Sequence, residues 1–339
     1  MESHIVKARL LAAGKVYVEP GFALPRLFDR STAGPGAGSK ALAFRFGKTR
    51  LKLAISPHPN ECLRLTRAGS FILDGDKIAG GVEIEPILLH CPGQAFVNLG
   101  AGCVYDCAFC STPQTSERLS ERITEDRVVK TILDAARKEG FQSVAITGGV
   151  IGSPEKSVEG MARVLRKVRA ALPDAPMGVE PYISGLSQVK VLRDAGADEI
   201  KINVETATDE LFSKVCRGRD RDAAIAALER AVALFGEGKV ASNIICGLGE
   251  SDEEALECAG RLMDMGVVPN LRALRVNDRN SGNLKAALGF APQAQPAERQ
   301  VGLSAKSKRM MSARGLTTLT FETMCFPCMC CDLVPFRDL

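Results

Sequence analysis

Three cysteines lie close together in the segment GAGCVYDCAFCSTPQ, residues 100–114, which follows a short apolar run. Cys103, Cys107 and Cys110 have the spacing C-x3-C-x2-C, and glycines precede them. Cysteine thiolates this close in sequence are typical metal ligands. The segment, called the cysteine loop below, therefore predicts a metal centre that takes three local thiolates.

A cube of four irons suits this loop better than a single zinc ion does. Structural zinc takes four protein ligands, and its local pair is normally C-x2–4-C, whereas a four-iron cube can hold three thiolates and leave one iron open. That open iron can bind a small molecule through amine and carboxylate groups. A zinc loop, or thiols that are buried only for packing, is the alternative at this point.

A second group of cysteines lies near the C-terminus, in the segment CFPCMCC at 325–331. Cys325, Cys328 and Cys331 have the ferredoxin-like spacing C-x2-C-x2-C. This spacing predicts a second iron–sulfur cluster. Structural zinc held by four thiolates is the alternative here.

The fourth ligand of this second cluster is left open by the sequence. Cys330 is one candidate, although adjacent cysteines point in divergent directions and seldom bind one cluster together. Otherwise the fourth position is open or is filled by a distant group such as Cys62 or Cys91.

Composition bounds the class of protein. The chain of 339 residues is 45% apolar and 25% charged, which allows a full-sized core. A net charge of +4 and the absence of tryptophan give no sign of nucleic-acid binding. No apolar run reaches the roughly 18 residues of a membrane span, and no signal peptide is evident. We expect a cytoplasmic protein without membrane association, in which reducing conditions favour metal sites over disulfides.

The elements that must position these cysteines begin near residue 95, where short apolar runs alternate with amphipathic helical patterns. Such alternation predicts parallel strands with right-handed crossovers. A doubly wound sheet is possible, but the cysteine loop follows the first strand, and in a barrel it would lie at the catalytic end. We therefore predict an α/β fold with a partial (βα)6 TIM barrel, whose strands are AFVNL (95–99), SVAIT (143–147), MGVEPY (177–182), EIKINV (199–204), VASNIIC (240–246) and LRALRV (271–276).

The ends of the chain have a different character. Residues 1–92 read as a small β-rich module with hairpins that turn at Gly47–Lys48 and Asp74–Gly75. The barrel is expected over 93–285. A cysteine-rich extension follows over 286–339, with a helix near 296–314 and a strand over 316–322.

Polar residues at strand ends are further candidates for the interior of the barrel. Arg272 and Arg275 bracket the sixth strand at odd spacing, which predicts that they point to opposite faces. One of them should face the barrel interior, where a buried guanidinium needs an anion, either the carboxylate of a bound cofactor or an acidic substrate. A surface arginine paired with a helix carboxylate is the alternative. Glu180 is a candidate contact of a cofactor or substrate inside the barrel, and a charge that faces a helix is the alternative.

The cysteine loop resembles the radical SAM superfamily, in which S-adenosylmethionine (SAM) occupies the open iron. Phe109, the aromatic residue directly before the third cysteine, matches the family form C-x3-C-x-aromatic-C. TGGV at 147–150 resembles the family's GGE motif, so that Gly148 and Gly149 would hold the SAM amine through backbone groups. Val150 stands where the family has glutamate.

Two later segments carry the resemblance further along the chain. Glu205, in NVETA, matches the fourth-strand residue that reaches the SAM ribose or amine. NIICGLGES resembles the fifth-strand motif G-x-I-x-G-x-x-E, with Asn243 replacing the first glycine. The matching residues Ile245, Gly247 and Glu250 are therefore expected at the adenosine site, although Glu250 is also placed to cap the next helix.

The resemblance implies an enzyme with a [4Fe–4S] cluster that cleaves SAM reductively to a 5′-deoxyadenosyl radical. The chain looks most like the biotin-synthase-related branch, and an archaeal-type two-component lipoyl synthase subunit is the nearest pattern. Sulfur insertion into C–H bonds, with the tail cluster as an auxiliary [4Fe–4S] sulfur donor, is the leading expectation. Radical methylation or rearrangement, with the tail cluster relaying electrons, is the alternative, and a non-catalytic scaffold is a third.

The same resemblance implies partners. A one-electron donor such as ferredoxin or flavodoxin is expected, together with an acylated carrier protein and a paired radical SAM subunit. No catalytic acid or base is assigned from the sequence.

Overall fold

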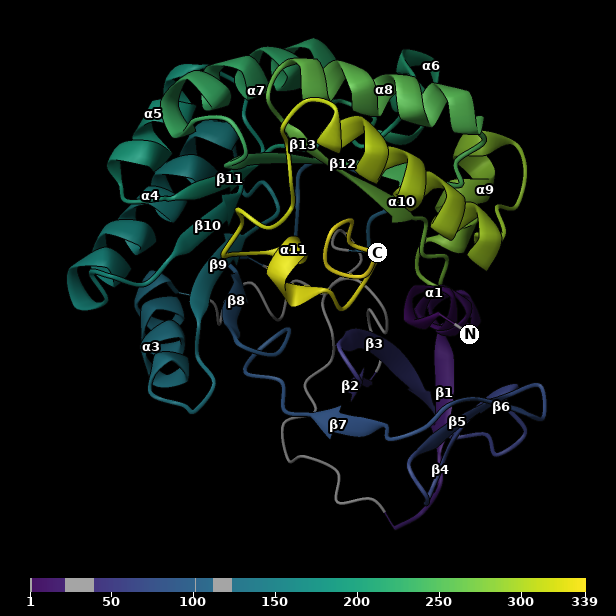
Figure 1. Cartoon of the computed structure of the whole chain (residues 1–339). Helices are drawn as coiled ribbons and strands as arrows, with labels where there is room; N and C mark the ends of the chain where they lie inside the picture. The colour runs from purple at the N-terminus through teal and green to yellow at the C-terminus, as the bar shows by residue number, and fades with distance from the viewer. Residues whose placement is uncertain (1, 22–39, 101, 112–123) are drawn as a thin grey trace.

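The computed structural model of the chain describes residues 2–21, 40–100, 102–111 and 124–339. Within these ranges the strands form two sheets, one of seven strands in the N-terminal module and one of six parallel strands. Figure 1 shows the parallel strands as an arc, with helices along its outer side and the C-terminal residues inside it. Among the described residues, no helix is long and apolar enough to cross a membrane.

The six parallel strands follow one another in chain order across the sheet. A doubly wound sheet would reverse its strand order at a switch point, so the observed order identifies the arc of a partial TIM barrel and confirms that prediction. The strands are β8 (Gln94–Asn98), β9 (Ser143–Thr147), β10 (Met177–Glu180), β11 (Glu199–Lys201), β12 (Val240–Cys246) and β13 (Val268–Ala273).

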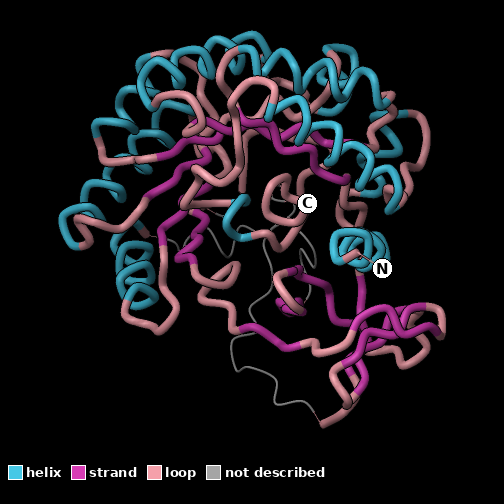
Figure 2. Tube along the Cα trace, viewed as in Figure 1, coloured by secondary structure: helices cyan, strands magenta, loops and turns pink. Residues whose placement is uncertain are grey.

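Helices that alternate with the strands cover the outer side of this arc, as the cyan coils around the magenta strands in Figure 2 show. Side chains at several of their N-termini accept a hydrogen bond from a backbone N–H of the first turn, which fixes where each helix begins. Ser251 and Glu254 form a reciprocal capping box. The helices are α3 (Glu125–Ala136), α4 (Pro154–Ala171), α5 (Ser187–Asp194), α6 (Asp209–Val215), α7 (Arg221–Phe235) and α8 (Asp252–Asp264).

The N-terminal module contains both predicted hairpins. The β2–β3 and β5–β6 pairs are antiparallel and turn at the expected glycines. Its strands are β1 (Lys15–Val18), β2 (Ala41–Phe46), β3 (Thr49–Ser56), β4 (Leu63–Thr66), β5 (Ser70–Leu73), β6 (Asp76–Ala79) and β7 (Glu83–Glu85).

One helix of this module was not predicted. Helix α1 (Ser3–Ala13) contacts β3 and helix α10 (Ala297–Ser312), so it joins the first residues of the chain to the last. Its apolar residues do not gather on one face, because it is covered on two sides, and it therefore lacks the amphipathic pattern that would reveal it.

The C-terminal extension holds α9 (Ser281–Leu288), α10 and the short helix α11 (Cys325–Cys328). The predicted helix near 296–314 is confirmed, but the strand predicted over 316–322 is wrong. The N–H groups of Glu322 and Thr323 donate to the carboxylate of Glu199, not to a neighbouring strand. A side chain of the barrel thus accepts the backbone hydrogen bonds that a neighbouring strand would otherwise take, and the segment forms turns.

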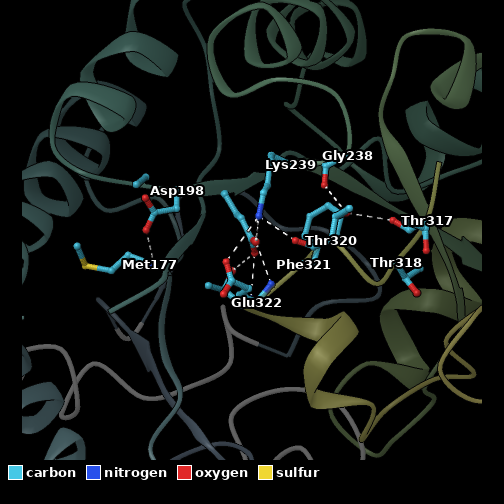
Figure 3. A network of polar contacts seen from close by, with 12 residues as sticks. Met177, Asp198, Gly238, Lys239, Thr317, Thr318, Thr320, Phe321 and Glu322 are labelled. Atoms are coloured by element: carbon cyan, nitrogen blue, oxygen red, sulfur yellow. Dashed lines mark hydrogen bonds and ion pairs between the residues drawn. The ribbon is translucent and has the colours of Figure 1, made fainter. Parts of the chain in front are cut away.

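The residues after α10, called the tail (316–339), close the base of the barrel, where the parallel strands begin. Lys239, just before β12, donates to the Thr320 carbonyl, and the Thr320 hydroxyl donates to the Gly238 carbonyl (Figure 3). Gln94, the first residue of β8, exchanges two hydrogen bonds with the Met324 backbone, at 2.9 and 2.7 Å. The cysteine loop follows the opposite end of β8, so the two cysteine groups approach the barrel interior from its two ends.

Candidate functional site

A cavity of about 350 Å³ occupies the barrel interior between the cysteine loop and the tail. This volume lies at the lower end of the range of ligand pockets in proteins. The cavity is lined by all three loop cysteines and by three tail cysteines, namely Cys103, Cys107, Cys110, Cys325, Cys328 and Cys331. The structure therefore brings the two predicted ligand groups to one chamber.

The cysteine loop lies against the end of β9. The Val150 N–H donates to the Cys103 sulfur at 3.3 Å. A Cβ atom added to Gly149 would lie 2.1 Å from the Gly102 carbonyl oxygen, so only glycine permits this close approach. Gly148 and Gly149 both line the cavity. The double glycine thus shapes the loop that presents the cysteines, and the valine in the third position leaves this contact intact.

Glu205 lies in a strained backbone conformation beside the same loop, with φ at 64°. Its carboxylate is buried and pairs with Arg219 at 2.8 Å. The Arg219 guanidinium also stacks on Tyr182, with 5.0 Å between its central carbon and the ring centre, and its Nε has no hydrogen-bond partner among the described residues. All three residues line the cavity.

Charge explains why this arginine is held inside the protein. Burial works against its charged form, but the charges of the Glu205 carboxylate and the Cys107 thiolate outweigh burial and raise the pKa of Arg219. Sequence reasoning missed Tyr182, in the loop after β10, and Arg219, between α6 and α7, because each is a single loop residue that belongs to no spaced motif.

The residues of the predicted fifth-strand motif, NIICGLGES, do not all lie at the cavity. Ile245 lines the cavity, whereas Gly247 and Glu250 are not among the residues that line it. The Glu250 carboxylate accepts hydrogen bonds from the N–H groups of Gly247 and Leu248, at 2.7 and 2.9 Å, and pairs with Arg299. Glu250 thus holds the turn that precedes α8, and the structure does not bring it to the other predicted SAM contacts.

At the other end of the chamber, buried cations face the tail cysteines. Lys201 donates to the Cys325 sulfur at 3.2 Å and pairs with Glu180 at 3.0 Å. Although burial works against its charge, Cys325 and Glu180 raise the pKa of Lys201 above its ordinary value. This end of the chamber therefore favours negatively charged ligands or thiolates.

The two arginines of the sixth strand also lie here, and the expectation that they point to opposite faces is wrong. Strand β13 ends at Ala273, so Arg275 lies beyond the regular alternation, and both arginines line the cavity. Arg272 pairs with the buried Asp332 at 3.2 Å. Arg275 donates to the carbonyl of Cys331 at 2.6 Å.

The side chains of the two cysteine groups can be compared with the ligands that a single metal ion or an iron–sulfur cluster requires. In the part of the chain that the structure describes, no group of three or more histidine, cysteine, aspartate or glutamate side chains is placed to hold a single metal ion. The cavity-lining cysteines present sulfur from two separate groups, which is the donor type of iron–sulfur clusters. The Gly149 backbone lies against the loop that carries Cys103, and Lys201 donates a hydrogen bond to Cys325. The sulfur donors of the cysteine loop and of the tail are thus of the type that iron–sulfur chemistry requires.

The fold is shared with a solved enzyme. Methylornithine synthase has a TM-score of 0.50 to this chain, with 20% identity, over 65% of this chain and 62% of that one. At this identity the likeness concerns the fold.

Sequence comparisons give the family. Residues 97–262 match the radical SAM superfamily. A biotin synthase from Desulforudis audaxviator is 29% identical over 181 residues, which are 51% of this chain and 52% of that protein. A lipoyl synthase from Glaesserella parasuis is 25% identical over 176 residues, 51% and 53% of the two chains. The matches thus span about half the length of these relatives. Residues 97–262 of the chain are thus similar to the radical SAM superfamily, and about half of the chain is similar to biotin synthase and lipoyl synthase.

Proposed function

We propose that this protein is a radical SAM enzyme that inserts sulfur into unactivated C–H bonds, as in the synthesis of lipoyl groups or biotin. One observation supports the proposal above all: the two cysteine groups line opposite ends of one chamber. When bound, a [4Fe–4S] cluster in the cysteine loop supplies the electron that cleaves SAM to a 5′-deoxyadenosyl radical, and a second cluster in the tail supplies sulfide. A substrate in the chamber would meet both.

The residues at the mouth of the barrel would bind and orient SAM. Cys103, Cys107 and Cys110 would hold the cluster through three thiolates. The backbone of Gly148 and Gly149 would take the SAM amine. We assign Glu205 to the ribose or amine, because its paired and buried carboxylate already faces the chamber.

The residues at the base would hold the second cluster and seal the chamber. Cys325, Cys328 and Cys331 would be its ligands. The hydrogen bonds of Glu199 to the tail close the strand ends, which keeps water from the radical. Arg272 and Lys201 would balance the negative charge of the thiolates.

The wider assignment follows the same proposal. The protein would work in the cytoplasm with a one-electron donor such as ferredoxin or flavodoxin. Its substrate would be an octanoyl group on a carrier protein, and a paired radical SAM subunit would share the reaction.

The test uses protein reconstituted anaerobically with iron and sulfide, then incubated with SAM, dithionite and an octanoyl-lysyl peptide. We expect about eight irons per chain, formation of 5′-deoxyadenosine, and loss of sulfide from the protein as carbon–sulfur product appears. Methylation or rearrangement would instead leave the sulfide count unchanged during turnover. About four irons with stoichiometric zinc would exclude the sulfur-donor role of the tail.

A further inference from the structure

Cys91 lies beside the tail cysteines although it is more than two hundred residues away in sequence. It is fully buried and belongs to one apolar cluster with Cys328 and Cys330. It lines the cavity together with the three tail cysteines. Four cavity-lining thiols are therefore gathered at the base of the barrel.

The segment that carries Cys91 is fastened to the tail. Cys91 forms a bridge to Gln94, and the Leu88 N–H donates to the Cys91 carbonyl at 3.2 Å. Gln94 is the residue whose side-chain amide exchanges two hydrogen bonds with the Met324 backbone, directly before Cys325. The position of Cys91 relative to the tail is thus set by two buried hydrogen bonds.

The other two candidates for the fourth ligand, Cys330 and Cys62, do not line the cavity as Cys91 does. Cys330 is buried but is not among the residues that line the cavity, and its carbonyl accepts a hydrogen bond from the Lys52 N–H of β3 at 2.7 Å. Cys62 is exposed and lies just before β4 in the N-terminal module. Cys330 therefore anchors the tail to the N-terminal sheet, and Cys62 faces solvent.

The charge of the chamber fits four thiolates at its base. Among the described residues that line it, the cations are one more than the carboxylates: Lys201, Arg219, Arg272 and Arg275 against Glu180, Glu205 and Asp332. Lys201 and Arg272 act electrostatically on the tail thiols, and Lys52 acts on Cys91 from the outer side. A four-iron cluster with four thiolates is negatively charged, so these cations stabilise it.

We infer that Cys91 is the fourth ligand of the tail cluster, beside Cys325, Cys328 and Cys331. This inference rests on the proposed tail cluster and assigns its remaining coordination site. The cluster then joins the segment between the N-terminal module and β8 to the C-terminal tail. Cys330 serves packing and backbone anchoring.

The experiment starts from a parent chain in which Cys103, Cys107 and Cys110 are all alanine, so that any remaining cluster belongs to the tail. We expect about four irons per chain in this parent after anaerobic reconstitution, with the electron paramagnetic resonance (EPR) spectrum of a reduced [4Fe–4S] cluster. Cys91→Ala in this background should lose the fourth iron on mild oxidation and give a [3Fe–4S] signal. Cys62→Ala, the matched control, should keep the parental iron count and spectrum, as should Cys330→Ala.

A serine variant separates ligation from folding. Cys91→Ser offers an oxygen ligand of similar size, so it should retain four irons but shift the EPR spectrum of the reduced cluster. The inference would be overturned if Cys91→Ser kept the parental spectrum. It would also be overturned if Cys330→Ala gave the [3Fe–4S] signal while Cys91→Ala kept the parental spectrum. If the parent chain holds no cluster, both the inference and the proposed tail cluster are overturned. If the parent and the Cys91→Ala variant both keep an intact four-iron cluster, the inference alone is overturned.

Discussion

Gly178→Ala should detach the tail from the barrel and leave the cysteine loop intact. Gly178 lies in β10, and a Cβ atom there would lie 2.0 Å from the Thr323 hydroxyl oxygen and 2.8 Å from its Cβ. Thr323 is fully buried, so it cannot swing into solvent. Either the strand or the tail must move.

The cost can be worked from the contacts that would be lost. Forcing a methyl group into a packed site costs about 1–3 kcal/mol. Moving Thr323 also disturbs its two hydrogen bonds to Glu199, and each bond to a charged group contributes about 1.5–3 kcal/mol. The sum, about 4–9 kcal/mol, is comparable to the whole stability of a domain. Local release of the tail is then the less costly response.

The assay compares Gly178→Ala with Gly185→Ala, whose Cβ would meet no atom of the described residues within 4 Å. We expect Gly178→Ala to bind about four irons instead of eight, to cleave SAM, and to show faster hydrogen exchange in the tail. Adding Thr323→Ala should partly restore the tail, because it removes the closest contact. Full iron content and native exchange in Gly178→Ala would refute the packing argument.

Three further predictions follow from the site. Replacing Cys103, Cys107 or Cys110 by alanine should abolish 5′-deoxyadenosine formation, and retained formation would contradict the assignment of the loop. Gly149→Ala should lose only the loop cluster, measured as about four remaining irons, because its Cβ would lie 2.1 Å from the Gly102 oxygen; a full iron count would count against this contact. Arg272→Met should lower the free energy of unfolding by about 3–5 kcal/mol, since it leaves the buried Asp332 unpaired. Arg272→Met combined with Asp332→Leu should recover much of that loss in chemical denaturation, and an unstable double variant would argue against the pair.

The barrel could be predicted from sequence because its signals are local. Ser143–Thr147 and Val240–Cys246 are short buried runs, and the structure has strands with these bounds. The hairpin turns carry their own glycines, so they too were visible in the sequence. The cysteine spacings identified candidate ligands for the same reason.

The features that sequence could not give depend on distant contacts. The segment 316–322 has a strand-like pattern, but its backbone bonds to side chains of the barrel and not to a neighbouring strand. Glu199 accepts from the Glu322 N–H, and Lys239 donates to the Thr320 carbonyl. The proximity of Cys91 to Cys328 arises only when the tail closes the base. Glu250 matched a motif by position, and its hydrogen bonds show that it holds the turn before α8.

The most direct test of the central claim follows sulfur from the tail cluster into product. The protein is reconstituted with heavy-isotope sulfide, desalted, and incubated with SAM, dithionite and an octanoyl-lysyl peptide deuterated along its chain. Deuterium in 5′-deoxyadenosine reports that the radical reaches the peptide. We predict heavy sulfur in the peptide product and none in the variant with Cys325, Cys328 and Cys331 replaced by alanine. Deuterium transfer with unlabelled sulfur, or with no sulfur in the peptide, would contradict the account.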